Sequence, residues 1–267
     1  MISKGALKAK SVLDECGLDD LLDFDLELFL YGRGAILNES PLVNADGRIT
    51  FGKSNSLITI DSSIEFEGRR RFTIAHELGH HEMHKGRMIQ HQENSGTLSW
   101  FEKKVNESKF GIQEVEANQF AAELLMPTNR FIEEANNLPF SPDLLRHLAD
   151  IFKTSITSTA FRYLEIGNHP ICLFFVVNNI VQYWKKSADF RHYIGDKTGF
   201  PPPTHSVAAE FFNNQIIYPK NASKQEIYKS TWFELNSWEN DENFDFYEYC
   251  IVVPKYRTAL SVVWDES

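Results

Sequence analysis

The sequence predicts an α+β fold in two parts that divide near Gly167. Before that glycine, long stretches with helical spacing of apolar residues alternate with three short β-type runs. After it, the apolar runs are short and separated by turn residues, as in antiparallel sheets. A chain of 267 residues can form one large domain or two modest ones. We therefore expect a first domain over residues 1–167 and a smaller α+β domain with an antiparallel sheet over residues 168–267.

The first part is expected to contain a small sheet packed on a long helix. Early helices are predicted over residues 4–16 and 20–31, and strands around residues 35–37, 48–51 and 57–60. No proline interrupts residues 67–84, where Phe72, Ala75 and Gly79 recur at helical spacing. Glycine weakens a helix by roughly 1 kcal/mol relative to alanine, so Gly79 indicates that another backbone passes close by.

This predicted helix contains the pentapeptide His76-Glu77-Leu78-Gly79-His80. Residues four apart share one face of a helix, so His76 and His80 can direct their rings at one metal ion. Two histidines with a glutamate after the first form the H-E-x-x-H pattern of zinc metalloproteases. In that pattern Glu77 is the general base, which handles the protons of the attacking water. An ordinary core helix would have Leu or Ile at the two histidine positions.

A catalytic zinc ion usually has three protein ligands, so a third residue is needed. Residues 113–126 are strongly helical, and Glu114 lies at the edge of their apolar face. Glu114 is our candidate ligand. Glu116 is the rival, two positions further on and therefore elsewhere on the helical wheel. His84 continues the four-residue spacing and is expected to contact a ligand or the substrate, whereas His81 and His91 are expected to be exposed.

Residues 70–80 (RRFTIAHELGH) and 114–127 (EVEANQFAAELLMP) resemble the ImmA/IrrE family of metallopeptidases. The resemblance covers about residues 5–167. It implies a zincin-like peptidase domain with one Zn²⁺ per chain, in which Glu114 completes a gluzincin-type site. It also implies a bacterial or phage-borne protein whose substrate is a helix-turn-helix transcriptional repressor.

Residues 142–167 scan like a DNA-reading helix-turn-helix pair. Residues 130–165, however, contain four basic and five acidic side chains, and the whole chain has a formal charge of −10. Phosphate binding needs a basic face, so we expect no direct contact with nucleic acid. The resembled family has this helix pair within its peptidase domain, which implies a structural role. Arg162 matches an arginine of the family pattern; it could stabilise the oxyanion, or simply form a salt bridge along the helix.

The second part is expected to begin with a β-hairpin. Its predicted elements are strands over residues 172–177 and 180–184, a loop at 201–203, a helix over 207–212 and strands over 249–253 and 259–264. It contains no recognisable ligand cluster or nucleophile motif. It could recognise a substrate, sense a signal or hold a partner.

Cysteine usage and hydropathy limit the location of the protein. Cys16, Cys172 and Cys250 are far apart and odd in number, which favours free thiols in a reducing compartment. The sequence has neither a run of about eighteen apolar residues nor an N-terminal signal pattern. We expect a cytoplasmic protein without membrane contact. The polar residues 85–112, between the second and third candidate ligands, could wall or cover the cleft.

Two other classes of function remain open. One is a catalytically silent module that holds a repressor, for which a closed metal site with His84 as a fourth ligand would be the sign. The other is a DNA-binding regulator that uses residues 142–167, although the local charge is unfavourable. Regulatory zinc metallopeptidase is the function that the sequence favours.

Overall fold

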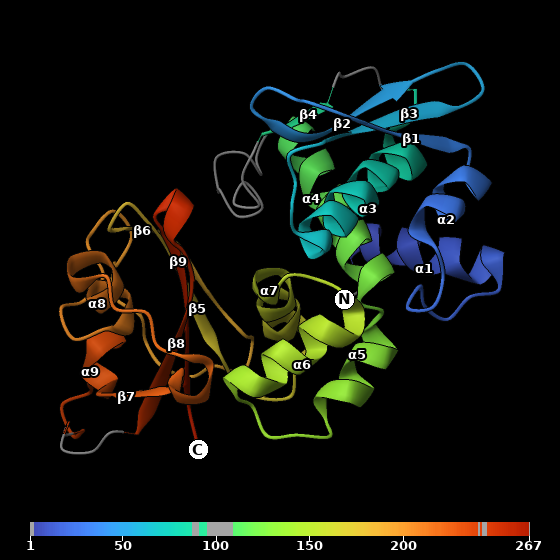
Figure 1. Ribbon diagram of the computed structural model, residues 1–267. Helices are drawn as coiled ribbons and strands as arrows, with labels where there is room; N and C mark the ends of the chain where they lie inside the picture. Colours follow the sequence, from blue (N-terminus) through green and yellow to red (C-terminus); the bar gives the residue numbers. More distant parts are fainter. Residues whose placement is uncertain (1–2, 87–90, 95–108, 240, 242–244, 267) are drawn as a thin grey trace. The chain divides into compact units, whose positions relative to one another are not determined.

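The computed structural model describes residues 3–86, 91–94, 109–239, 241 and 245–266. The chain divides into two compact units, Met1–Glu134 with Leu148–Ser155, and Ala135–His147 with Ile156–Ser267. Each unit has its own sheet (Figure 1). The predicted fold class is confirmed: a small sheet with helices, followed by an antiparallel sheet. The domain boundary at residue 167 stays a prediction.

The first unit combines helices with a four-stranded sheet. Its elements are α1 (Lys4–Cys16), α2 (Leu26–Gly32), β1 (Ala35–Ser40), β2 (Ala45–Phe51), β3 (Ser56–Asp61), α3 (Glu67–His84), β4 (His91–Asn94) and α4 (Lys109–Leu125). Helices α5 (Thr128–Ala135) and α6 (Pro142–Phe152) cross the division between the units. The strand order is β1-β3-β2-β4, with β1 parallel to β3 and the other pairs antiparallel.

Helix α2 is shorter than the predicted range of residues 20–31, which was wrong at its start. The Asp25 carboxylate accepts hydrogen bonds from the backbone N–H groups of Glu27 and Leu28, so it caps the helix there. Upstream, the Asp20 carboxylate accepts from the N–H of Leu22 and stabilises a turn instead. Because these side chains compete for backbone N–H donors, α2 begins six residues later than the apolar pattern predicts.

Helix α3 is the central element of the first unit. It contacts β2 and β3 as well as α4, and α4 in turn contacts α1 (Figure 1). Two glycines allow these close approaches. A Cβ atom at Gly79 would lie 3.1 Å from the Cα of Ala117, and one at Gly5 would lie 2.2 Å from the carbonyl oxygen of Glu116. The backbone that Gly79 indicated is thus that of α4, which brings the motif helix against the predicted third ligand.

The second unit contains a five-stranded antiparallel sheet. Its remaining elements are α7 (Ile156–Ile166), β5 (Cys172–Val177), β6 (Ile180–Lys186), α8 (Val207–Asn214), the 3-10 turn η2 (Lys220–Ala222), β7 (Gln225–Ile227), α9 (Lys229–Trp232), β8 (Phe246–Val253), the 3-10 turn η3 (Pro254–Tyr256) and β9 (Thr258–Asp265). The strand order is β6-β5-β9-β8-β7. Asn178 and Asn179 both have positive φ, as the predicted two-residue hairpin turn between β5 and β6 requires.

A buried carboxylate ties the sheet of the second unit to its helices. Glu248 on β8 accepts hydrogen bonds from the N–H of Val207 at 2.8 Å and of Ala208 at 3.1 Å, at the start of α8. The indole N–H of Trp232 donates to it at 3.1 Å. Burial raises the pKa of Glu248 in spite of these donors. The residue therefore has a structural role at the N-terminus of α8.

None of the described helices has the length and apolar character needed to cross a lipid bilayer. Within the predicted segment 85–112, residues 87–90 and 95–108 lie outside the described part of the chain. The proposed covering role of that segment therefore stays a prediction.

Candidate metal centre

His76 and His80 lie one turn apart on α3 and face the same buried space. Their exposed fractions are 1% and 0%. Their Nε2 atoms are 3.0 Å apart, so each ring directs the same nitrogen towards the other. This is the arrangement that the four-residue spacing predicts for two ligands of one ion.

Glu114 on α4 completes the group. Its Oε2 lies 3.2 Å from Nε2 of His76, and its Oε1 lies 3.3 Å from Nε2 of His80. One ligand atom from each of the three residues lies within 4.8 Å of the others. Two imidazole nitrogens and one carboxylate, all buried, form a donor set that suits zinc. The residues of this chain therefore fit the metal that the motif implies.

Glu77 is held between α3 and β2. Its side chain is fully buried, and a Cβ atom at Gly47 of β2 would lie 2.8 Å from its Oε1 and 2.6 Å from Cγ2 of Thr73. Strand β2 thus leaves room for the carboxylate only because residue 47 is glycine. Sequence reasoning missed Gly47, although an isolated glycine inside a strand is a known sign of a close approach.

The outer nitrogens of the two histidines have hydrogen-bond partners of their own. Nδ1 of His76 lies 2.7 Å from Oδ1 of Asn118, and Nδ1 of His80 lies 2.9 Å from Nδ1 of His84. Such partners fix the orientation of metal-binding histidines. Asn118 was not predicted, although its position four residues after Glu114 places both on one face of α4.

Glu116, the rival ligand, contacts His84. Its Oε2 lies 3.0 Å from Nε2 of His84, and its Oε1 accepts a hydrogen bond of 2.7 Å from the ammonium group of Lys4. Burial alone raises the pKa of Glu116, but the bonds from Lys4 and His84 outweigh it and leave the pKa below its usual value. Glu116 is therefore an ionised neighbour of His84, and Glu114 faces the two motif histidines.

His81 is buried, so the expectation that it would be exposed was wrong. Its Nδ1 lies 2.8 Å from Oγ of Ser56, and its Nε2 lies 3.0 Å from the carbonyl oxygen of Arg33. Burial lowers its pKa, which favours the neutral ring. His81 therefore lies on the side of α3 that faces β3, whereas His76, His80 and His84 contact one another on a different face. The side chain of His91 lies outside the described part of the chain.

Arg162 lies on α7 in the second unit, where it is buried. Its guanidinium group lies 3.5 Å from the carboxylate of Glu165, one turn along the same helix. This contact is the salt bridge that we considered from sequence. A role for Arg162 in stabilising an oxyanion stays a prediction.

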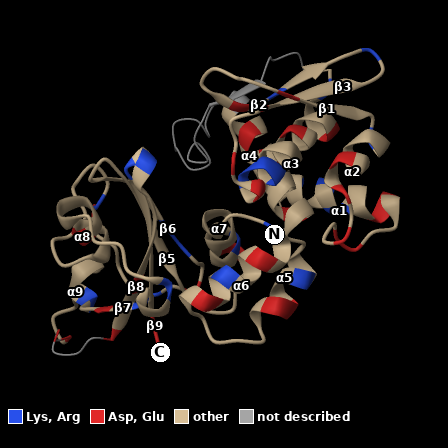
Figure 2. Ribbon diagram, viewed as in Figure 1, with Lys and Arg blue, Asp and Glu red and all other residues tan. Residues whose placement is uncertain are grey.

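Of the helices α6 and α7, which scan like a DNA-reading pair, α6 has both signs of charge, as does α5 before it. Figure 2 shows acidic and basic residues on α5 and on α6. On α6, Arg146 pairs with Asp143 at 2.6 Å; on α5, Arg130 pairs with Glu134, also at 2.6 Å. These basic groups are therefore balanced by neighbours on their own helices.

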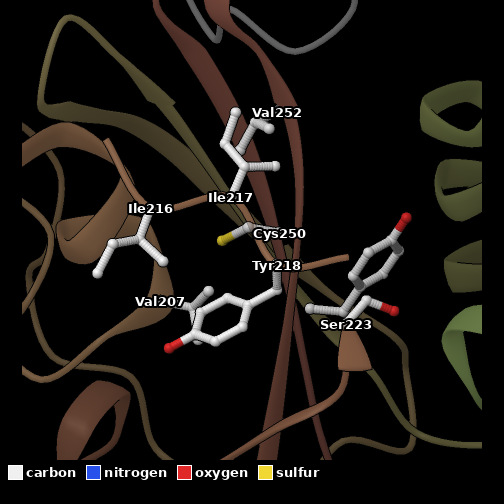
Figure 3. Close-up of a pocket in the computed structure, with 8 residues that line it drawn as sticks. Val207, Ile216, Ile217, Tyr218, Ser223, Cys250 and Val252 are labelled. Atoms are coloured by element: carbon white, nitrogen blue, oxygen red, sulfur yellow. The ribbon is translucent and has the colours of Figure 1, made fainter. Parts of the chain in front are cut away.

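A small hollow in the second unit has a different character. In Figure 3 the apolar side chains of Ile216, Ile217 and Val252 lie around the thiol of Cys250. Burial raises the pKa of this thiol, so it is protonated near neutral pH and a poor nucleophile. None of the residues that line the hollow is a histidine or a carboxylate, and it offers no metal site.

An α+β unit with a His-Glu-x-x-His helix and a buried His-His-Glu group defines a metallopeptidase-type centre. Residues 34–163 match the model of the M78 peptidase family, described as the IrrE N-terminal-like domain. This match confirms the predicted resemblance to the ImmA/IrrE family over residues 34–163. A solved structure of a Mycobacterium tuberculosis transcriptional regulator has a similar fold. Its TM-score is 0.61 at 15% identity, over 99% of this chain and 77% of that one. No curated protein matches the chain in sequence.

Proposed function

We propose that the chain is a zinc-dependent metalloendopeptidase. The observation that carries the proposal is the convergence of His76, His80 and Glu114 beside the buried carboxylate of Glu77. The match of residues 34–163 to the model of a peptidase family also supports it. In this proposal the first three residues hold one zinc ion and Glu77 is the catalytic residue.

The protein side chains have distinct tasks in the proposed reaction. Zinc, when bound, supplies a Lewis acid that polarises the scissile carbonyl and makes water more acidic. His76 and His80 offer their Nε2 atoms to the ion, because both Nδ1 atoms are engaged with neighbouring side chains. Glu114 would supply the third, negatively charged ligand, the number of protein ligands that is usual for a catalytic zinc ion.

Glu77 moves protons in this scheme. Its carboxylate would accept a proton from the attacking water and donate it to the nitrogen of the leaving amine as the peptide bond breaks. Gly47 and Thr73 lie against this side chain. The close packing limits the positions that the Glu77 carboxylate can adopt. This restriction favours proton transfer from the water to the leaving nitrogen.

We further propose that the substrate is a protein, namely a helix-turn-helix repressor, and that the reaction takes place in the cytoplasm. The support is the family resemblance, together with the three free cysteines, which suit a reducing compartment. The formal charge of −10 is compatible with a basic, DNA-binding partner.

The catalytic claim is tested with Glu77→Gln. Purified, zinc-loaded wild-type protein and the variant are each incubated with a mixed peptide library, and new amino termini are counted by mass spectrometry. We expect the variant to keep its zinc and to cleave about 100 to 10,000 times more slowly, since it lacks a general base. Equal cleavage by both proteins would refute the role of Glu77, and a zinc-loaded wild-type protein that cleaves nothing would favour the silent binding module.

The geometry is less favourable to a closed four-ligand site. His84 would have to turn a ring nitrogen towards the ion, but its Nδ1 faces Nδ1 of His80 and its Nε2 faces Glu116. With three protein ligands, the proposed site would keep a fourth position for water, as a catalytic zinc site requires.

A further inference from the structure

The two candidate ligand histidines are supported in different ways. Nδ1 of His76 faces the side-chain amide of Asn118. His80 instead begins a chain of three side chains from three helices: His84 on α3, Glu116 on α4 and Lys4 on α1. The successive heavy-atom distances are 2.9, 3.0 and 2.7 Å, all within hydrogen-bonding range.

The direction of the hydrogen bonds in this chain follows from its two ends. At one end, Nε2 of His80 faces His76 and Glu114, so it must be the nitrogen that lacks a proton when a metal is bound. The proton of the neutral ring is then on Nδ1, which donates to Nδ1 of His84. That leaves the proton of His84 on Nε2, which donates to the Glu116 carboxylate. At the other end, the Lys4 ammonium group donates to the same carboxylate.

Tight helix packing positions this chain. Gly5 follows Lys4 on α1, and the absence of a side chain there lets α1 approach the backbone of α4 at Glu116. His84 has an exposed fraction of 1%, so water cannot readily replace it as a partner of His80. The Glu116 side chain is less buried than that of His84, and the series of hydrogen bonds ends at the surface with Lys4.

We propose that His84, Glu116 and Lys4 are positioning residues that hold His80 in the tautomer and orientation needed to bind the metal through Nε2. The proposal rests on the proposed zinc site and adds three residues to it. Glu116 acts through His84, and an ionised carboxylate at the end of the chain makes Nε2 of His80 a stronger donor to the ion.

The test is the zinc dissociation constant of His84→Leu, measured by competition with a chromophoric chelator. Partners of metal ligands typically contribute 10- to 100-fold in affinity, so we expect the dissociation constant to rise by about that factor. His81→Leu is the matched control. It removes a neighbouring buried histidine of the same helix that also has partners at both ring nitrogens, but that contacts Ser56 and Arg33. This control should bind zinc within about twofold of wild type, because neither partner contacts the metal ligands.

Two further measurements separate positioning from a general loss of structure. His84→Gln restores an acceptor for His80 and a donor for Glu116, and it should recover part of the affinity. Long-range ¹H–¹⁵N NMR spectra of the zinc-free proteins should show His80 with its proton on Nδ1 in wild type and in His81→Leu, and a mixture of tautomers in His84→Leu. If His84→Leu does not fold, Glu116→Ala, at a partly exposed position, should raise the dissociation constant in the same direction.

The outcomes distinguish the two proposals. Equal losses of affinity in His84→Leu and His81→Leu, or none in His84→Leu, would overturn the positioning role while leaving the zinc site intact. Wild-type protein that binds no zinc would overturn the zinc site itself, and the positioning role with it. A selective loss in His84→Leu with recovery in His84→Gln is the expected result.

Discussion

At the scale of single residues, Glu114 and Glu116 are chemically identical but have different neighbours. Two positions on a helix differ by about 200°, so their carboxylates leave α4 in different directions. Glu114 reaches both motif histidines, whereas Glu116 reaches Lys4 and His84. The same letter in the sequence therefore supplies a candidate metal ligand in one case and a support for a ligand in the other.

Gly47 gives a prediction at this scale. In Gly47→Ala the new methyl group would lie 2.8 Å from Oε1 of Glu77 and 2.6 Å from Cγ2 of Thr73, so the carboxylate proposed as the general base must shift. A misplaced general base loses much of its advantage, and we expect peptide cleavage to fall by about 100-fold. Zinc content should be unchanged, because none of the three proposed ligands is crowded. Full activity in a folded Gly47→Ala protein would show that Glu77 does not depend on this contact.

Glu82 gives a pH-dependent prediction. Its carboxylate pairs with Arg33 at 2.7 Å and Lys8 at 3.1 Å. Burial raises its pKa, but these cations outweigh the burial, and the net pKa is lower than usual. A carboxylate with a depressed folded-state pKa stabilises the protein above its unfolded-state pKa, and that stability is lost as pH falls through the folded-state value. Glu82→Gln should therefore lower the free energy of unfolding by about 1–3 kcal/mol at pH 7.

The difference between wild type and Glu82→Gln should shrink as the pH falls from about 5 to 3, where the wild-type carboxylate also becomes neutral. Urea unfolding at several pH values, followed by circular dichroism, measures it. A difference that stays constant over this range would mean that packing of the side chain, and not its charge, is responsible.

At the scale of helices and strands, two helix pairs depend on glycine for their close approach. A methyl group at Gly5 would lie 2.2 Å from the carbonyl oxygen of Glu116, which can move only with α4. We expect Gly5→Ala to destabilise the protein by about 1–3 kcal/mol in urea unfolding, as overpacked sites do. Gly32→Ala is the matched control, since nothing lies within 4 Å of the added atom at the end of α2. It should leave stability unchanged or raise it by up to about 1 kcal/mol. Equal effects at both positions would contradict the packing argument.

The elements that the sequence predicts best are those with a long, uninterrupted pattern. Helix α3 has the predicted bounds of residues 67–84, because no proline breaks it and its inner stripe is continuous. The start of α2 was wrong since capping by Asp25 competes with the apolar pattern. Strand β7 and helix α9 have three and four residues, too few to show any periodicity. They form because the neighbouring strand β8 and the core of the second unit stabilise them.

The residues of the candidate site likewise differ in how well the sequence predicts them. The spacing within one helix predicts His76, Glu77 and His80 as a group, and the family resemblance selects Glu114 from two candidates. Gly47 and Asn118 could not be identified, because their roles depend on how β2 and α4 approach α3. Such distances follow from packing between elements, and a single sequence does not contain them in any periodic form.

At the scale of the whole molecule, the charge distribution argues against a direct role at DNA. The formal charge is −10, and the arginines of α5 and α6 pair with acidic residues one turn away. We expect no binding to a random-sequence duplex at about 0.1 M salt, because counterion release needs unpaired basic groups. Fluorescence anisotropy with a labelled duplex at several salt concentrations measures this. Binding that weakens steeply with salt would instead favour a DNA-binding regulator.

The claim on which the rest depends is that His76, His80 and Glu114 hold one metal ion. The most direct test is elemental analysis of the protein purified without added metal, beside Glu114→Gln and the matched variant Glu116→Gln. We predict about one zinc ion per chain in wild type, its loss in Glu114→Gln and its retention in Glu116→Gln, whose amide oxygen can still accept a hydrogen bond from His84. Wild-type protein that contains no metal even after zinc is offered, or a Glu114→Gln variant that retains it, would contradict the account.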